Sequence, residues 1–129
     1  MILDSSAIVA VLRAERDARE YAEAITSAVK CRVSAVNYVE AAVVIDSSRD
    51  PVASRRFDDF FRASRVDVET VTPNQAELAR QAYSDFGKGR HKAGLNFGDC
   101  FAYALAKELD EPLLFKGDDF RHTDIEAAI

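Results

Sequence analysis

The stretch LNFGDCFAYALA, residues 95–106, predicts a helix whose first turn carries a carboxylate and whose body packs in a hydrophobic core. Asn96 is a favourable N-cap, and Asp99 falls at the third helical position, where the helix dipole favours negative charge. Gly98 leaves room for another group to approach the backbone. Large apolar residues recur every four positions and form one stripe of the helix: Phe97, Phe101, Leu105 and Leu109. Asp99 is explained equally well as a capping-box acid or as a functional carboxylate, so the other acids must decide.

Outward from this helix, short apolar strands alternate with helices along the 129 residues. The expected strands lie at residues 1–4, 31–34, 66–71 and 113–115. The expected helices lie at residues 7–12, 17–29, 35–45, 50–65, 72–86 and 96–109, and a short tail helix starts at 123. This alternation predicts one α/β domain over residues 1–129, in which a mostly parallel sheet carries helices on both faces.

Polar residues mark several of these helix starts. We expect Ser5 or Ser6 to cap the first helix, Ser34 the third, and Thr72 the fifth, with Gln75 closing a capping box. The helix at 50–65 is expected to bury Val52, Phe57, Phe60 and Phe61.

The composition limits the classes of function. The net charge of −5 and the pI near 5.0 exclude a protein that binds nucleic acid through its overall field. A nucleic-acid partner must then be held by a local basic patch, by metal ions, or by both. No apolar run approaches a membrane span, and Asp4 interrupts the N-terminus before any leader forms. We therefore expect a cytoplasmic protein without a membrane role, in which Cys31 and Cys100 are reduced core thiols.

Carboxylates stand where the strands are expected to end. Asp4 follows the first strand, and Asp118 and Asp119 follow the last one, while Asp99 opens a helix entered from a similar loop. In parallel α/β sheets, ligands bind at the carboxyl ends of the strands. These acids are therefore expected to meet at one edge of the sheet.

Glu40 is the most informative acid, because it lies in an almost continuously apolar helix. An unpaired buried carboxylate is costly or becomes protonated, and no Lys or Arg lies within a helical turn of it. Either a distant arginine pairs with Glu40, or the side chain opens into an acidic pocket.

A cluster of Asp4, Glu40, Asp99 and Asp118 or Asp119 would destabilise the fold unless a cation lay among the carboxylates. Oxygen ligands without His or Cys suit Mg²⁺ or Mn²⁺ rather than zinc. Ions held in this way can activate water for the displacement of a phosphate ester.

A basic loop precedes the helix that carries Asp99. Its charged residues are Lys88, Arg90, His91 and Lys92. They form either a solvated loop or a rim that grips phosphates beside the acidic pocket.

With these residues placed, the chain resembles the PIN-domain ribonucleases, and within them the VapC toxins of bacterial toxin–antitoxin pairs. The resemblance covers nearly the whole chain. It is carried by ILDSSA (2–7), SAVNYVE (34–40), GKGRH (87–91), LNFGDCFAY (95–103), LLFKGDDF (113–120) and TDI (123–125).

The resemblance implies a three-layer α/β/α sandwich and a Mg²⁺-dependent endoribonuclease in which Mn²⁺ can substitute. It implies Asp4 and Asp99 as metal ligands, Glu40 as a ligand or water-positioning group, and Ser6 and Asn96 as groups that orient them. The fourth acid is Asp118 or Asp119, with Asp119 favoured. The implied partners are an RNA substrate, a VapB-type antitoxin that covers the groove, and a second toxin copy, in a homodimer or a toxin–antitoxin hetero-oligomer. The alternatives are a PIN module that binds RNA or protein without cutting, and a structure-specific nuclease on the same fold.

Overall fold

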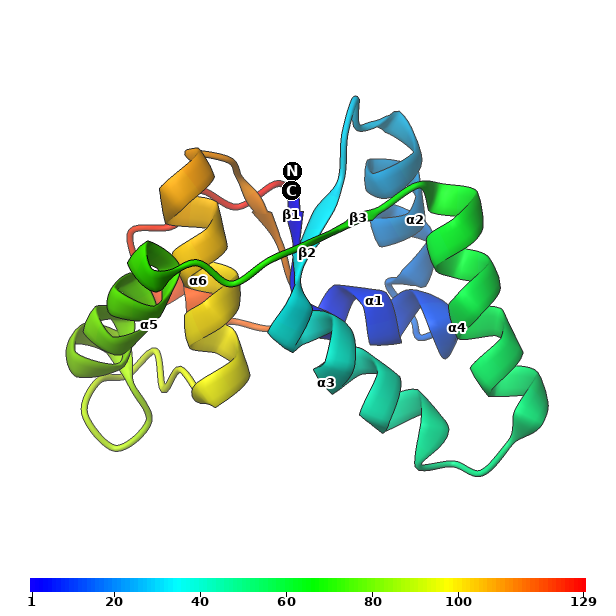
Figure 1. Cartoon of the computed structure of the whole chain (residues 1–129), viewed down its shortest axis with the longest axis horizontal. Coiled ribbons are helices and arrows are strands. Elements are labelled where there is room, and N and C mark those ends of the chain that lie inside the picture. Colours follow the sequence, from blue (N-terminus) through cyan, green and yellow to red (C-terminus); the bar gives the residue numbers. More distant parts are fainter.

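Four short strands form the centre of the computed structural model, which describes residues 1–129 (Figure 1). Their order across the sheet is β3 (Asp67–Glu69), β2 (Arg32–Ser34), β1 (Ile2–Leu3) and β4 (Leu113–Leu114). Every neighbouring pair is parallel. The parallel sheet expected from the alternating pattern is confirmed, and the strand predicted at 66–71 lies at an edge.

Helices cover both faces of this sheet, so the molecule has three layers (Figure 1). One layer contains α5 (Pro73–Phe86) and α6 (Phe97–Leu109), on the left of the view. The opposite layer contains α1 (Ser5–Leu12), α2 (Ala18–Ser27), α3 (Ala35–Asp46) and α4 (Pro51–Ser64). None of these helices has the length and apolar character needed to cross a membrane.

The pleat of the two central strands divides the hydrophobic core in two. Ile2 and Leu113 point into the core beneath α5 and α6. Leu3 and Leu114 point into the core beneath the other four helices. All four side chains are fully buried, as expected for strands covered on both faces. The strands are thereby held in place, so their carboxyl ends form a fixed edge.

Helix capping agrees with the sequence at most positions. Ser34 and Thr72 accept hydrogen bonds from the first turns of α3 and α5. The first helix differs, because Asp4 rather than Ser5 or Ser6 is its N-cap. Gln75 does not close a capping box, since its side chain bonds to Glu108 on α6.

Three apolar side chains predicted to be buried are exposed. Val52 on α4 is 51% exposed, and Phe97 and Leu109 at the two ends of α6 are 74% and 39% exposed. The i, i+4 stripe on α6 is wrong at both ends, because a different face of the helix is buried there: Phe97 is exposed while the adjoining Gly98, Asp99 and Cys100 are buried. The buried surface instead follows the small residues of its middle, including Ala102, Ala104 and Ala106.

The predicted tail helix from 123 is also wrong. The chain forms a 3₁₀ helix, η1 (Asp119–His122), before that point. Ala127 then forms a parallel bridge with Leu113. Pairing of the tail with β4 satisfies backbone groups that the sheet edge would otherwise expose.

Candidate functional site

The carboxyl edge of the sheet holds a cleft of about 350 Å³. Four carboxylates from four separate elements line it, at the end of β1, in α3, in the first turn of α6 and in η1. They are Asp4, Glu40, Asp99 and Asp119. Ser6 and Asn96 line the same cleft. The juxtaposition expected from strand ends and helix starts is therefore present.

Asp4 presents one bonded and one unbonded oxygen. Its Oδ2 accepts hydrogen bonds from the backbone N–H of Ser6 at 2.9 Å and from the Ser6 hydroxyl at 2.5 Å. The Ser6 hydroxyl in turn accepts the N–H of Lys116 at 3.0 Å. The second oxygen, Oδ1, is buried and has no hydrogen-bond partner. Burial raises the pKa of Asp4, while the Ser6 bonds lower it and the charge of Glu40 raises it further.

Asp99 is fixed by a reciprocal pair of hydrogen bonds with Asn96. The Asp99 N–H donates to Asn96 Oδ1, and the Asn96 N–H donates to Asp99 Oδ2, both at 2.9 Å. The pKa of Asp99 is raised to about 7, chiefly by burial; the Asn96 bond acts against this rise, and the charges of Asp4, Glu40 and Asp119 contribute to it. Both expectations for Asp99 are met, because the capping acid also belongs to a cluster of like charges.

Glu40 opens into this cleft and pairs with no arginine. Its Oε1 accepts a hydrogen bond from the Ser5 hydroxyl. Its carboxylate lies against Gly98, where a β-carbon would be 2.1 Å from Oε2. The acidic-pocket alternative for Glu40 is therefore the one that the structure supports, and the group that approaches Gly98 is this carboxylate.

The adjacent acids of the last loop point to different places. Asp119 lines the acidic cleft. Asp118 lines a separate hollow and lies 4.0 Å from Arg121. Asp118 is therefore not brought to the cluster, because the turn at Gly117 and the start of η1 send neighbouring side chains in different directions.

The basic loop does not reach the cleft. None of Lys88, Arg90, His91 and Lys92 lines it. Arg90 lies over the ring of Tyr83, and His91 accepts the Ala93 N–H and packs on Phe86. The loop is thus organised on the α5 side, and its role in binding RNA stays a prediction.

Two polar residues of the cleft were not assigned from the sequence. Ser5 holds Glu40, and Lys116 lines the cleft while pairing with Glu15. Each adjoins a strand end, which is the only signal in the sequence that could have identified them.

The donor set fits a hard divalent cation. No three His, Cys, Asp or Glu side chains are grouped tightly enough to form a ready-made metal site. Mg²⁺ suits such an arrangement, because it is usually held by one or two carboxylates and completes its shell with waters and substrate phosphates. The buried, unpartnered Oδ1 of Asp4 is the atom that most requires a cation or a proton.

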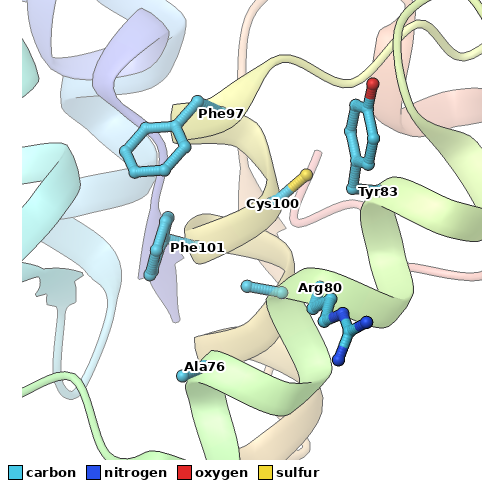
Figure 2. Close-up of a pocket in the computed structure, with 7 residues that line it drawn as sticks. Ala76, Arg80, Tyr83, Phe97, Cys100 and Phe101 are labelled. Carbon is cyan, nitrogen blue, oxygen red and sulfur yellow. The ribbon is translucent and has the colours of Figure 1, made fainter.

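A second cavity, of about 380 Å³, lies between α5 and α6 (Figure 2). Phe97, Cys100 and Phe101 face it from α6, and Ala76 and Tyr83 from α5. Its only charged lining residue is Arg80. Burial raises the pKa of the Cys100 thiol to about 11, so the thiol is no nucleophile near neutral pH. This cavity contains no catalytic group.

Comparison with known proteins identifies the architecture. The family model described as PIN domain matches residues 1–126. The solved structure of VapC20 from Mycobacterium tuberculosis, described as a toxin that cleaves the sarcin–ricin loop, gives a TM-score of 0.77 at 17% identity, covering 96% of this chain and 95% of that one. A toxin–antitoxin complex from Klebsiella pneumoniae gives 0.72 at 15% identity, covering 95% and 92%. The fold and the acidic cleft define a PIN-domain protein.

A curated relative places the chain more narrowly. Ribonuclease VapC28 of Mycobacterium tuberculosis is 54% identical over 130 residues, covering 100% of this chain and 98% of the relative. The chain belongs to the VapC ribonuclease family, which confirms the resemblance seen in the sequence. Its activity is accordingly that of an RNA-cleaving hydrolase, and ribonucleases of this family generally depend on a divalent metal.

Proposed function

We propose that the acidic cleft is the catalytic centre at which this chain hydrolyses RNA phosphodiester bonds as the toxin of a toxin–antitoxin pair. The proposed ion is Mg²⁺, with Mn²⁺ as a substitute. The observation that carries the proposal is the buried, unpartnered oxygen of Asp4 within a cleft lined by three further carboxylates. Such a concentration of negative charge is stable only with cations or protons among the acids.

The four carboxylates of the cleft would have two different roles. Asp4 and Asp99 would hold the ion, and Glu40 and Asp119 would complete its surroundings or orient the attacking water. A divalent ion bound there lowers the pKa of a water and offsets the negative charge that develops on the phosphate.

Two polar residues keep the ligands in place. Ser6 fixes Oδ2 of Asp4, which leaves Oδ1 free for the ion. Asn96 fixes Oδ2 of Asp99 at the start of α6. Both would therefore act on the metal through the carboxylates that they orient.

The RNA backbone would be gripped outside the cleft. Lys116 is the cationic residue of the cleft itself, although Glu15 offsets part of its charge. The basic loop, with Lys88, Arg90, His91 and Lys92, would extend the contact along the α5 side. Contacts of this kind supply affinity without reading sequence. Because a toxin of the same fold is described as cleaving the sarcin–ricin loop, an RNA loop is the first substrate to test.

The proposed partners are a VapB-type antitoxin that covers the cleft and a second copy of the toxin. The toxin–antitoxin complex with the same fold supports the first. Exposed apolar residues on α3 and α6 support the second toxin copy, because these two helices contact each other and the residues could form part of one interface. They are Val39, Val43 and Phe97. The free, buried thiols of Cys31 and Cys100 suit a cytoplasmic location, where thiols stay reduced.

The experiment compares wild type, Asp4→Asn and Asp99→Asn on structured RNA, single-stranded RNA and DNA, with Mg²⁺ and with EDTA. Each substitution should lower RNA cleavage by about 100-fold or more, since the ion supplies several kcal/mol and each 1.36 kcal/mol is tenfold. Circular dichroism should show an unchanged fold.

Other outcomes separate the alternatives. Cleavage by either variant at the wild-type rate in Mg²⁺ would reject the assignment of the site. RNA binding that persists in EDTA without any cleavage by the wild type would identify a binding module. A preference for DNA would identify a different nuclease on the same fold.

A further inference from the structure

Asn37 is a fully buried amide in α3, one helical turn before Glu40. Its Nδ2 donates a hydrogen bond of 3.0 Å to the backbone carbonyl of Gly98. Gly98 immediately precedes Asp99 in the first turn of α6. The amide therefore joins the two helices that carry these two acids, at the end where the acids lie.

The amide group is not explained by packing alone. Its Oδ1 is buried and has no hydrogen-bond partner, so the accepting end of the amide loses its bonds to water on folding without replacement. An apolar side chain of similar size would avoid that cost. The hydrogen bond to Gly98 is therefore the feature that distinguishes this amide from an apolar side chain of the same size.

Gly98 shows which position is specified. A β-carbon there would lie 2.1 Å from Oε2, 2.6 Å from Cδ and 2.6 Å from Oε1 of Glu40. The whole carboxylate therefore rests on the backbone of α6. The same residue that receives the Asn37 bond also supports the Glu40 carboxylate, so the bond sets how closely Glu40 approaches the start of α6.

We propose that Asn37 is a positioning residue for the acidic cleft. By holding α3 against the Gly98 carbonyl, it places the Glu40 carboxylate beside Asp99 so that both can serve one bound ion. The proposal rests on the proposed function, since it assumes that the cleft binds a divalent cation.

Gln75 provides a matched control. It is also a buried amide, its Oε1 also lacks a partner, and its Nε2 also bonds to α6. Its partner is Glu108, near the opposite end of that helix. Removal of either amide should therefore loosen the packing of α6. Only removal of the Asn37 amide should displace the carboxylates of the cleft.

The experiment compares the full chain with Asn37→Leu and with Gln75→Leu. Mn²⁺ binding is measured without RNA by the electron paramagnetic resonance of the free ion. Thermal unfolding and the kcat and KM for RNA cleavage in Mg²⁺ are measured alongside. We expect Asn37→Leu to weaken Mn²⁺ binding by about 10- to 100-fold, the usual effect of losing a residue that orients metal ligands. It should lower kcat more than it raises KM. Gln75→Leu should leave Mn²⁺ binding and kcat within about twofold of wild type, even if its melting temperature falls as much as that of Asn37→Leu.

A further variant tests the same contact from α6. In Gly98→Ala the added carbon must displace the Glu40 carboxylate, so Mn²⁺ binding should weaken as in Asn37→Leu. If Asn37→Leu does not fold, Asn37→Ser replaces it, because a hydroxyl is too short to keep the bond to Gly98.

The outcomes are distinct. Mn²⁺ binding by Asn37→Leu (or Asn37→Ser) within twofold of wild type would overturn the positioning role while leaving the proposed function intact. Equal losses in the Asn37 and Gln75 variants would assign both amides to folding alone. Failure of the wild type itself to bind Mn²⁺ and cleave RNA would instead reject the proposed function.

Discussion

Two hollows of similar size flank the start of α6, and they differ in almost everything else. The acidic cleft measures about 350 Å³ and the apolar cavity about 380 Å³. Asn96 and Asp99 face the first, whereas Phe97, Cys100 and Phe101 face the second. One helix thus separates a site of concentrated charge from a site of exposed apolar surface.

The volume of a hollow therefore does not indicate where the chemistry occurs in this fold. The cavity between α5 and α6 could accept an apolar group, but no carboxylate or imidazole that could bind a hard ion lines it (Figure 2). The cleft concentrates carboxylates whose charges raise one another's pKa, as at Asp99. Substitutions that exchange or remove these features should test the contrast.

After the losses expected for Asp4→Asn and Asp99→Asn, the next largest effect is expected at the last acid of the cleft. Asp119→Asn should lower kcat by about tenfold to 100-fold, because Asp119 borders the cleft together with the proposed ligands Asp4 and Asp99. Asp118→Asn should change it by less than about twofold, since Asp118 borders a different hollow. The measurement is RNA cleavage in saturating Mg²⁺. A larger loss in Asp118→Asn would show that the last loop rearranges when RNA binds.

A smaller effect is expected from the basic loop, which belongs to neither hollow. Replacing Lys88, Arg90 and Lys92 together by Ala should raise KM and leave kcat nearly unchanged, because phosphate contacts add affinity rather than chemistry. For three contacts to single-stranded RNA, the slope of log binding constant against log salt should fall by about 2. Binding titrations at several salt concentrations measure this slope. An unchanged slope would leave the loop as a solvated surface.

The cleft should also affect stability through pH. The pKa values of Asp4 and Asp99 in the folded, metal-free protein lie above their unfolded values, and that of Asp99 is about 7. The folded state therefore binds more protons, so the protein should become more stable as pH falls from about 8 to about 5. Below about 4.5 the trend should reverse, because Glu108, Glu111 and Asp124 have lowered pKa values.

Thermal melts without metal at about pH 8 and about pH 6 measure this gain, and Asp99→Asn should reduce it. Added Mg²⁺ should reduce it as well, since the ion favours the charged carboxylates. Equal melting temperatures of the metal-free wild type at both pH values would contradict the crowding of acids in the cleft.

The smallest effect is expected from the apolar cavity. Arg80→Ala removes the only charge that lines it, and the residue is exposed. Cleavage should stay within about twofold of wild type, as for surface substitutions away from a site. A clear rise in KM would show instead that the apolar cavity takes part in RNA binding, and the contrast between the two hollows would then be wrong.

Much of this arrangement could be predicted from the chain itself. The alternation of strands and helices, the caps Ser34, Thr72 and Asn96, and the convergence of Asp4, Glu40 and Asp99 all follow from short-range patterns. Periodicity and capping involve residues within a few positions of one another, so they can be identified from the sequence without knowledge of the fold. The carboxyl ends of parallel strands must share one edge, which brought the distant acids together in the prediction.

Only the tertiary structure decided which of several residues close together in the sequence face the cleft. The choice between Asp118 and Asp119, the exposure of Phe97, and the placement of the basic loop beside α5 depend on how turns and helix ends pack against distant elements. The bond from Asn37 to Gly98 joins residues 61 positions apart, so no local pattern contains it. A side chain's neighbours along the chain are set by sequence, but its direction at a loop or helix end is set by long-range contacts.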